Sequence, residues 1–194
     1  IQQSFMHCEK LQQHIQFLYS HGSLYKVYNG NLLYHGCIPL TKDGKFLPVR
    51  LFGKTYTGRA LYDVLDSYAR KGYYATDDRE RIRGQAILWY LWENPDSPVF
   101  GKEKMATFER YFVADKALHV EPKNPYYQML NDEKMADAVL KEFGLSGADA
   151  HIINTSRSRQ RRENRRSNVP ANCSSLTVVC LKPISQRPVL PDIH

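Results

Sequence analysis

The sequence has few cysteines and no long apolar run. Its 194 residues include four cysteines, and none of them lies in a CxxC pair, so no zinc or dithiol redox motif is visible. We interpret them as reduced thiols of a cytosolic protein. No apolar stretch reaches the roughly 18 residues that a membrane-spanning helix needs, and no basic stretch followed by an apolar one marks a signal peptide. We therefore expect a cytoplasmic protein with no membrane partner.

Aromatic residues are missing from residues 155–194. This segment carries eight basic and two acidic residues, so it holds +6 of the chain's net charge of +7. Its abundance of arginine, serine and proline is typical of segments that cannot build a hydrophobic core. We place a boundary at Asn154, between a body of residues 1–154 and a tail of residues 155–194 that we expect to be irregular. The body is nearly neutral and gives no electrostatic reason to expect a nucleic-acid partner.

Several well-known catalytic motifs are also absent. The chain contains no P-loop, no GxGxxG and no GxSxG, so nothing indicates a nucleotide-binding loop or a serine hydrolase elbow. Its histidines form no HxH or HExxH pattern, which removes the common zinc-peptidase arrangements.

Hydrophobic periodicity in the body predicts a mixed α/β fold. Leu11, Ile15 and Leu18 follow helical spacing, and the helix is expected to end at Gly22. The Asn29-Gly30 pair predicts a tight hairpin turn. The strands expected from alternating or buried apolar patterns are residues 24–28, 31–35, 46–52 and 150–153.

Three further helices are expected along the body. They cover residues 58–71, 77–92 and 132–143, whereas residues 104–113 do not favour one type of structure. The first two of these helices start after Thr or Asp residues that can cap them, such as Thr57 and Thr76.

His35 is the most informative single residue for chemistry. It ends an apolar strand and is followed by Gly36, an arrangement that can hold an imidazole rigidly while the chain turns close to a substrate. The pattern allows a metal ligand, but on spacing alone a core histidine hydrogen-bonded to a backbone carbonyl is the more common case. The cations Lys102, Lys104 and Arg110 are candidate phosphate-binding residues, although each alone is more commonly an ordinary surface charge. No catalytic acid or base can be selected.

A long run of residues carries a specific family resemblance. Residues 17–39, FLYSHGSLYKVYNGNLLYHGCIP, resemble the signature of class III fructose-1,6-bisphosphatases. Further similar segments follow in the family's order, and they are AILWYLW, SPVFGKEKMATFERYF, EPKNPYY and HIIN. The resemblance covers nearly all of residues 1–154.

The resemblance implies a fold, a cofactor and an activity. The family belongs to the calcineurin-like metallophosphatases, so residues 1–154 would be a carboxy-proximal part of an α/β sandwich with a helical insertion. His35 would be a ligand of a two-manganese site, whose cations offset charge on the phosphoryl oxygens. The implied substrate is fructose 1,6-bisphosphate, hydrolysed to fructose 6-phosphate in gluconeogenesis, and a homo-oligomer is expected for the intact enzyme.

Two departures from the family pattern stand out. The upstream Asp-rich and Gly-Asn-His motifs, which supply most of the family's metal ligands, have no counterpart, so we expect little phosphatase activity from this chain alone. After Asn154 the family continues with Gly-His-x-Pro-Val, VIDGG and SKAYQ motifs. Codons that are compatible with the residues of the tail can encode strings similar to these motifs when they are read in a shifted frame. We therefore expect the tail to result from a frame shift. The alternative interpretation is a non-catalytic protein whose Arg-rich residues 157–166 bind RNA or another polyanion.

Overall fold

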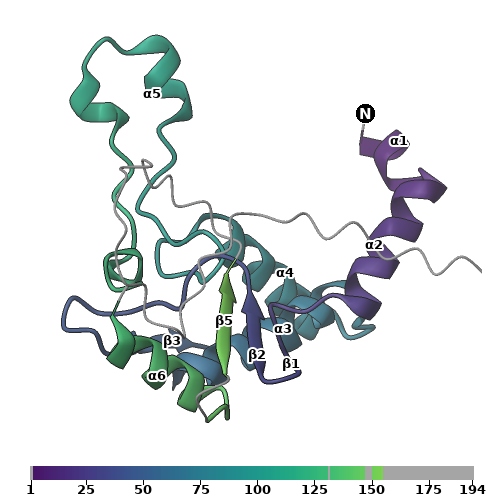
Figure 1. Ribbon diagram of the computed structural model, residues 1–194. Coiled ribbons are helices and arrows are strands. Elements are labelled where there is room, and N and C mark those ends of the chain that lie inside the picture. The colour runs from purple at the N-terminus through teal and green to yellow at the C-terminus, as the bar shows by residue number, and fades with distance from the viewer. Residues whose placement is uncertain (1, 131, 147–149, 155–194) are drawn as a thin grey trace, which may run out of the picture.

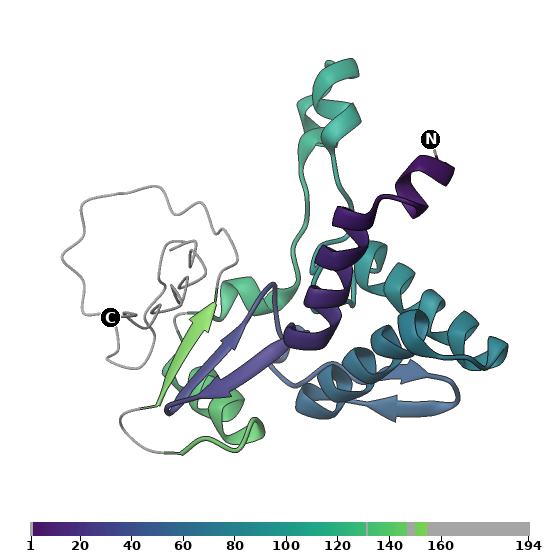
Figure 2. The same ribbon diagram turned by 90° about the vertical axis from the view of Figure 1, so that its right-hand side faces the viewer.

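A small three-stranded sheet and a pair of long helices form the centre of the protein (Figures 1 and 2). The computed structural model describes residues 2–130, 132–146 and 150–154. The helices are α1 (Gln2–Met6), α2 (Glu9–His21), α3 (Gly58–Tyr74), α4 (Asp78–Glu93), α5 (Thr107–Phe112) and α6 (Glu133–Glu142), with short 3₁₀ helices η1 (Lys116–His119) and η2 (Pro125–Gln128). The strands are β1 (Tyr25–Tyr28), β2 (Asn31–Tyr34), β3 (Val49–Leu51), β4 (Lys54–Tyr56) and β5 (His151–Asn154). This order confirms the predicted mixed α/β class.

The three-stranded sheet has the order β1-β2-β5 and mixes both directions. Strands β1 and β2 form the predicted antiparallel hairpin. Its two turn residues, Asn29 and Gly30, both have positive φ, as the tight hairpin turn requires. Strand β5 then pairs in parallel with β2, which places the ends of these two strands at the same edge of the sheet.

One face of this sheet builds the first hydrophobic core. Leu32 and Ile152 from neighbouring strands are buried together with Val139 and Phe143 from the α6 region. Figure 1 shows α6 beside β5, in agreement with the contacts between these two elements. The predicted helix over 132–143 and the strand over 150–153 are therefore confirmed, and each supplies the apolar side chains that its periodicity indicated.

Helices α3 and α4 form a helical hairpin over the second core. Gly72 and Gly84 lie where the helices cross, and a Cβ atom on Gly84 would come within 2.1 Å of the Gly72 nitrogen. The backbones can approach this closely only because neither residue has a side chain. Leu65 and Ile87 are buried in the resulting core, which the β3–β4 hairpin also lines through Val49.

Two details of this region differ from the sequence prediction. The strand expected over 46–52 is shorter, because the chain turns at Phe52 and Gly53, both with positive φ, and returns as β4, which the sequence did not indicate. Phe-Gly is not one of the dipeptides that usually mark such a turn.

The predicted N-caps are confirmed only in part, because Thr57 occupies the N-cap position of α3 but Thr76 does not occupy that of α4. The side chain of Thr57 caps nothing, and the Arg59 nitrogen instead donates to Glu142 at the end of α6 (3.0 Å). Asp77, rather than Thr76, caps α4 by accepting from the Glu80 nitrogen. A carboxylate at a helix start also stabilises the helix dipole, which a hydroxyl does not.

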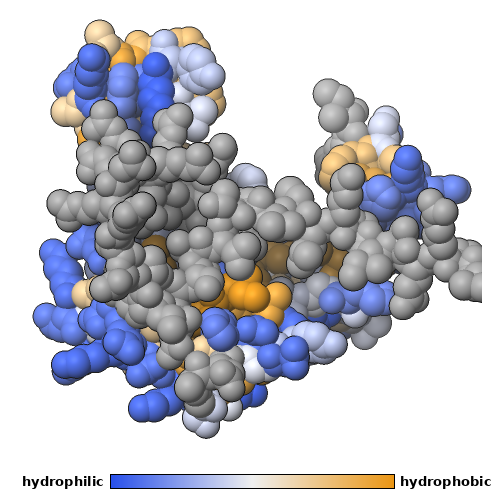
Figure 3. All heavy atoms as spheres, viewed as in Figure 1, coloured by the Kyte–Doolittle hydropathy of each residue, from blue (hydrophilic) through white to orange (hydrophobic). Residues whose placement is uncertain are grey.

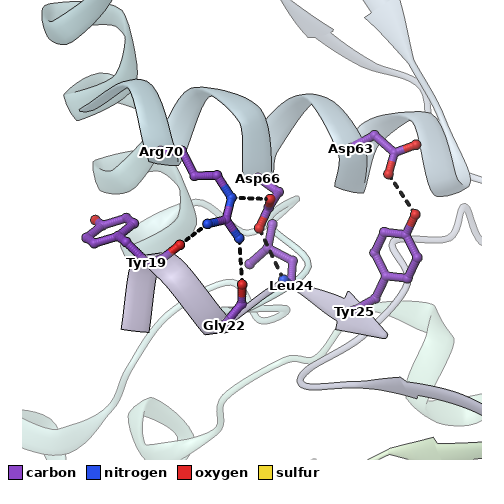
Figure 4. Close-up of polar contacts among 7 residues, drawn as sticks. All are labelled: Tyr19, Gly22, Leu24, Tyr25, Asp63, Asp66 and Arg70. Carbon is purple, nitrogen blue, oxygen red and sulfur yellow. Dashed lines mark hydrogen bonds and ion pairs between the residues drawn. The ribbon is translucent and has the colours of Figure 1, made fainter. Parts of the chain in front are cut away.

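Arg70 fixes the end of α2 to α3 (Figure 4). Its guanidinium donates to the carbonyl oxygens of Tyr19 and Gly22 and forms an ion pair with Asp66, with an Nε–Oδ2 distance of 2.8 Å. The positive charge therefore lies at the carboxyl end of α2, where the helix dipole favours it. As predicted, α2 ends before Gly22.

An arm of residues 102–123 projects from the body (Figures 1 and 2). Lys102 and Lys123 form an isolated antiparallel bridge at its base, and α5 and η1 lie at its tip. The ambiguous stretch 104–113 is thus helical only over α5. None of the helices in the described parts of the chain is long and apolar enough to cross a membrane.

Candidate functional site

The carboxyl ends of β2 and β5 bring together two polar residues that are distant in sequence. Tyr34 and Asn154, the last residues of the two parallel strands, are paired in register. His35 follows β2 directly and is exposed. The site therefore has His35 and Asn154 at one edge of the sheet, which is where ligands bind in open α/β sheets.

Gly36 makes the turn that follows His35 unusually tight. Its φ is +87°, and a Cβ atom at this position would lie 2.0 Å from the Pro98 carbonyl oxygen. The same oxygen accepts a 2.8 Å hydrogen bond from the Cys37 nitrogen. Only glycine combines this backbone conformation with this close approach, so the His-Gly pair is needed for the geometry of the turn.

Asn154 supports the turn through hydrogen bonds from its side chain. Its side-chain nitrogen donates to the Gly36 oxygen at 2.9 Å and to the Tyr126 hydroxyl at 3.0 Å. The Tyr126 hydroxyl is in turn hydrogen-bonded to the hydroxyl of Tyr34. Burial raises the pKa of both tyrosines well above the usual value, so they remain neutral hydrogen-bonding groups. This buried network fixes the position of the backbone that carries His35.

The turn is also held from α3. The Tyr62 hydroxyl is fully buried and donates to the Cys37 carbonyl oxygen at 2.9 Å. Backbone at Gly36 and Cys37 is thus restrained, which is the kind of support that orients a ligating or substrate-binding side chain.

The described residues do not make up a metal site by themselves. Within residues 2–130, 132–146 and 150–154, no three or more His, Cys, Asp or Glu side chains are grouped so that they could hold a metal ion. His35 therefore lies at the end of β2, beside a turn that Asn154 supports, and it belongs to no such group among the described residues.

The three predicted phosphate-binding cations all belong to the arm, and each contacts another part of it. Lys102 pairs with Glu121 (2.9 Å), and Arg110 also faces Glu121 (3.5 Å), whereas Lys104 donates to the Leu118 carbonyl oxygen (2.8 Å). The Ala106 nitrogen and Lys102 lower the pKa of Glu121 by donating to its carboxylate. The structure thus brings Lys102 and Arg110 together and gives both a role in shaping the arm.

Lys102 also lines a cavity at the base of the arm. The cavity has a volume of about 300 Å³, and Lys42 and Lys123 line it as well. Asp96 and Glu103 contribute acidic groups to the same wall. Lys102 is therefore in a hollow of a size that suits a small ligand.

Sequence reasoning missed Tyr62, Tyr126 and Asn154 as parts of this site. Asn154 ends the HIIN segment, but nothing local shows that it lies next to the turn after β2. Asn124 and Pro125 do indicate the start of η2, which carries Tyr126, since the Asn124 side chain accepts from the Tyr126 nitrogen (3.0 Å).

Cys37 is expected to resist alkylation in the folded protein. Its side chain is fully buried, and burial raises the pKa of the thiol to about 12. The reactive thiolate is then roughly a thousandfold scarcer at pH 8 than for an ordinary thiol of pKa about 8.5. Iodoacetamide treatment followed by peptide mass spectrometry should modify the exposed Cys8 and leave Cys37 unmodified until urea is added. Equal rates at Cys8 and Cys37 without urea would show that the core around the turn is open.

The predictions for the tail lie outside the described residues. These are the irregular structure of residues 155–194, the frame shift and the polyanion-binding segment 157–166. The comparisons with known proteins give the polyanion-binding alternative no support.

Those comparisons agree with each other. The family model described as Firmicute fructose-1,6-bisphosphatase matches residues 1–177. The chain is 55% identical over 152 residues to the class 3 fructose-1,6-bisphosphatase of Clostridium botulinum strain Kyoto, and 50% identical over 155 residues to that of Clostridium acetobutylicum. The alignments cover 78% and 79% of this chain, respectively, and 23% of each relative.

The residues covered by these matches can be compared with the boundary predicted at Asn154. The family match continues past Asn154, where the resemblance of the motifs ends, so the boundary itself stays a prediction. The chain spans about a quarter of the length of the curated relatives it matches. No solved structure matches the chain. Since the family model covers most of the sequence, this chain belongs to the Firmicute fructose-1,6-bisphosphatase family.

Proposed function

We propose that this chain forms part of the catalytic domain of a cytoplasmic, manganese-dependent fructose-1,6-bisphosphatase. The observation that carries the proposal is the placement of His35 and Asn154 at the ends of two adjacent parallel strands, in a chain that belongs to this family. In this proposal the reaction is the hydrolysis of fructose 1,6-bisphosphate to fructose 6-phosphate and phosphate. The sheet β1-β2-β5 would be one part of a calcineurin-like α/β sandwich.

His35 is proposed to supply one imidazole ligand to the metal centre. The backbone of the adjoining turn is held by Gly36, Asn154 and the buried tyrosines, so little backbone freedom would be lost when the imidazole binds a cation. The described residues offer no complete metal site, and the remaining ligands would come from other parts of the enzyme. A bound divalent cation would draw charge from a phosphoryl oxygen of the substrate.

Lys102 is the best placed of the three cations to contact a substrate phosphate. It lies at the base of the arm in the cavity that Lys42 and Lys123 also line. Lys104 and Arg110 lie farther along the arm, where they bind backbone carbonyl oxygens and Glu121. Their proposed contribution is to keep the arm, and thereby Lys102, in position.

A segment exchange tests the proposal. The part of the Clostridium acetobutylicum enzyme that matches this chain is replaced by residues 1–154, and phosphate release from fructose 1,6-bisphosphate is measured with Mn²⁺. We expect manganese-dependent activity from the exchanged protein and little from the 194-residue chain alone. His35→Ala should lower the activity at least tenfold, as loss of groups at a metal site commonly does.

His14→Ala is the matched control, because His14 is an exposed histidine on α2. It should leave the activity unchanged. A correctly folded exchanged protein without phosphatase activity, or one in which His35→Ala stays fully active, would contradict the proposal. Circular dichroism and gel filtration establish that the variants are folded.

A further inference from the structure

Helix α4 is apolar on two opposite faces. Gly84, Ile87 and Leu91 lie on the face that is buried against the rest of the protein. On the other side, Trp89 and Trp92 are 62% and 70% exposed, and Ile82 lies two turns before Trp89. A helix that is apolar all round is usually buried on all sides. We refer to Ile82, Trp89 and Trp92 as the tryptophan face.

The tryptophan face has the composition of a binding surface. Tryptophan is enriched among the residues that contribute most to protein–protein binding, because it buries a large rigid area. Trp89 and Trp92 are the only tryptophans in the chain. Both are on this face, and neither contributes to the two hydrophobic cores formed by the described residues.

Two other elements expose large apolar side chains in the same way. Helix α2 has no buried residue and exposes Phe17 and Leu18. The tip of the arm exposes Phe108, Tyr111 and Phe112, and Figure 3 shows hydrophobic atoms there among hydrophilic ones. Both α2 and the arm rise from the same side of the body in Figures 1 and 2.

The occupant of these surfaces must be large. A symmetric pair of chains would cover one self-complementary patch, whereas here three separate elements, α2, α4 and the arm, are uncovered. The curated relatives are much longer than this chain, which aligns with only 23% of their length. The unmatched part of such a relative is large enough to contact several elements at once.

We propose that the tryptophan face is where this chain docks onto the remaining part of a class 3 fructose-1,6-bisphosphatase polypeptide. The docking surface is apolar at its centre and is bordered by the charged residues Arg79, Arg83 and Glu93 of the same helix. A hydrophobic centre with a polar rim is the usual anatomy of a specific interface. The inference rests on family membership and on exposure, and it does not require the proposed activity.

Tryptophan fluorescence tests the docking directly, because both reporters are on the proposed surface. The probe is the Clostridium acetobutylicum enzyme with the segment that matches this chain deleted and its own tryptophans replaced by phenylalanine. The 194-residue chain alone should emit at the long wavelengths of water-exposed indoles. Addition of the probe should shift the emission to shorter wavelengths with saturation. Trp89→Glu and Trp92→Glu should each weaken binding at least tenfold, with the remaining tryptophan as reporter.

Tyr28→Glu provides the matched control. Tyr28 is a strongly exposed aromatic residue on β1, away from α4, so the same kind of change should leave binding unaffected. Equal weakening by Tyr28→Glu and Trp89→Glu would overturn the proposal, since binding would then not be specific to the tryptophan face. A shift that develops without the probe as the chain is concentrated, with dimers in sedimentation, would also overturn it by assigning the face to a second copy.

The segment-exchanged protein gives a second measurement that does not depend on folding of the deleted probe. There the tryptophan face should be covered, so Trp89→Glu should lower the urea midpoint of unfolding, whereas in the 194-residue chain the same change should leave the midpoint unchanged. If Trp89→Glu changed the urea midpoint equally in the exchanged protein and in the 194-residue chain, the proposal would be overturned. Neither measurement uses phosphatase activity, so a failure of docking and a failure of the proposed function can be distinguished.

Discussion

Gly84→Ala is expected to lower the free energy of unfolding by about 3 kcal/mol, although alanine is the better helix former by about 1 kcal/mol. The added Cβ would lie 2.1 Å from the Gly72 nitrogen, 2.4 Å from the Gly72 Cα and 2.4 Å from the Tyr68 carbonyl oxygen. All three atoms are backbone of α3, so no side chain can move aside. Helices α3 and α4 would have to separate, and the core between Leu65 and Ile87 would loosen.

Urea unfolding followed by circular dichroism measures this effect, and Ala86→Gly is the matched control. Ala86 is exposed on the same helix, so its change should cost only the helix-propensity difference of about 1 kcal/mol. Adding a methyl group at position 84 and removing one at position 86 should therefore both destabilise the protein. A Gly84→Ala midpoint equal to or above that of the unsubstituted chain would show that the helices do not cross here.

Gly36→Ala is expected to be the most damaging change at the candidate site. Alanine would meet two separate penalties, a positive φ and a Cβ placed 2.0 Å from the Pro98 oxygen. The first should cost about 1 to 2 kcal/mol. The second pushes the Pro98 carbonyl away from the Cys37 nitrogen that donates to it, and it should add at least about 2 kcal/mol.

Gly53→Ala separates the two penalties. Gly53 has nearly the same φ, +83°, but no atom lies within 4 Å of the position its Cβ would occupy. Its alanine variant should therefore show only the cost of the backbone conformation. In the segment-exchanged enzyme, Gly36→Ala should also reduce phosphate release, whereas Gly53→Ala should not. Equal free energies of unfolding for the two variants would mean that Pro98 does not pack against the turn.

The elements with strong local patterns were predictable from the sequence. The Asn29-Gly30 turn, the end of α2 and the amphipathic helix α6 follow from rules that act over a few residues. The β3–β4 hairpin was missed because Phe52 adopts a positive φ that its residue type disfavours. The capping of α3 by Glu142 was missed because the two partners are 83 residues apart.

The candidate site could be predicted only in part, because some of its contacts join residues that are distant in sequence. His35-Gly36 is recognisable because a strand, a histidine and a glycine follow one another. Asn154 is 118 residues from the Gly36 oxygen that it binds, and its place depends on the pairing of β2 with β5. The cations were chosen by charge, but in the structure Glu121 and backbone carbonyl oxygens determine where Lys102 and Arg110 lie.

The parallel pairing of β2 with β5 also dictates an order of events during folding. Asn31 pairs with His151, so one edge of β2 stays open until some 120 further residues have been synthesised. At roughly 5 to 20 residues per second, that interval lasts about 6 to 24 s. Hairpins and helices form within microseconds, so β1–β2 and α3–α4 can be complete long before β5 is available. In the nascent chain, the strand that leads to His35 is thus an unprotected template for other strands, which exposes this stretch to mispairing.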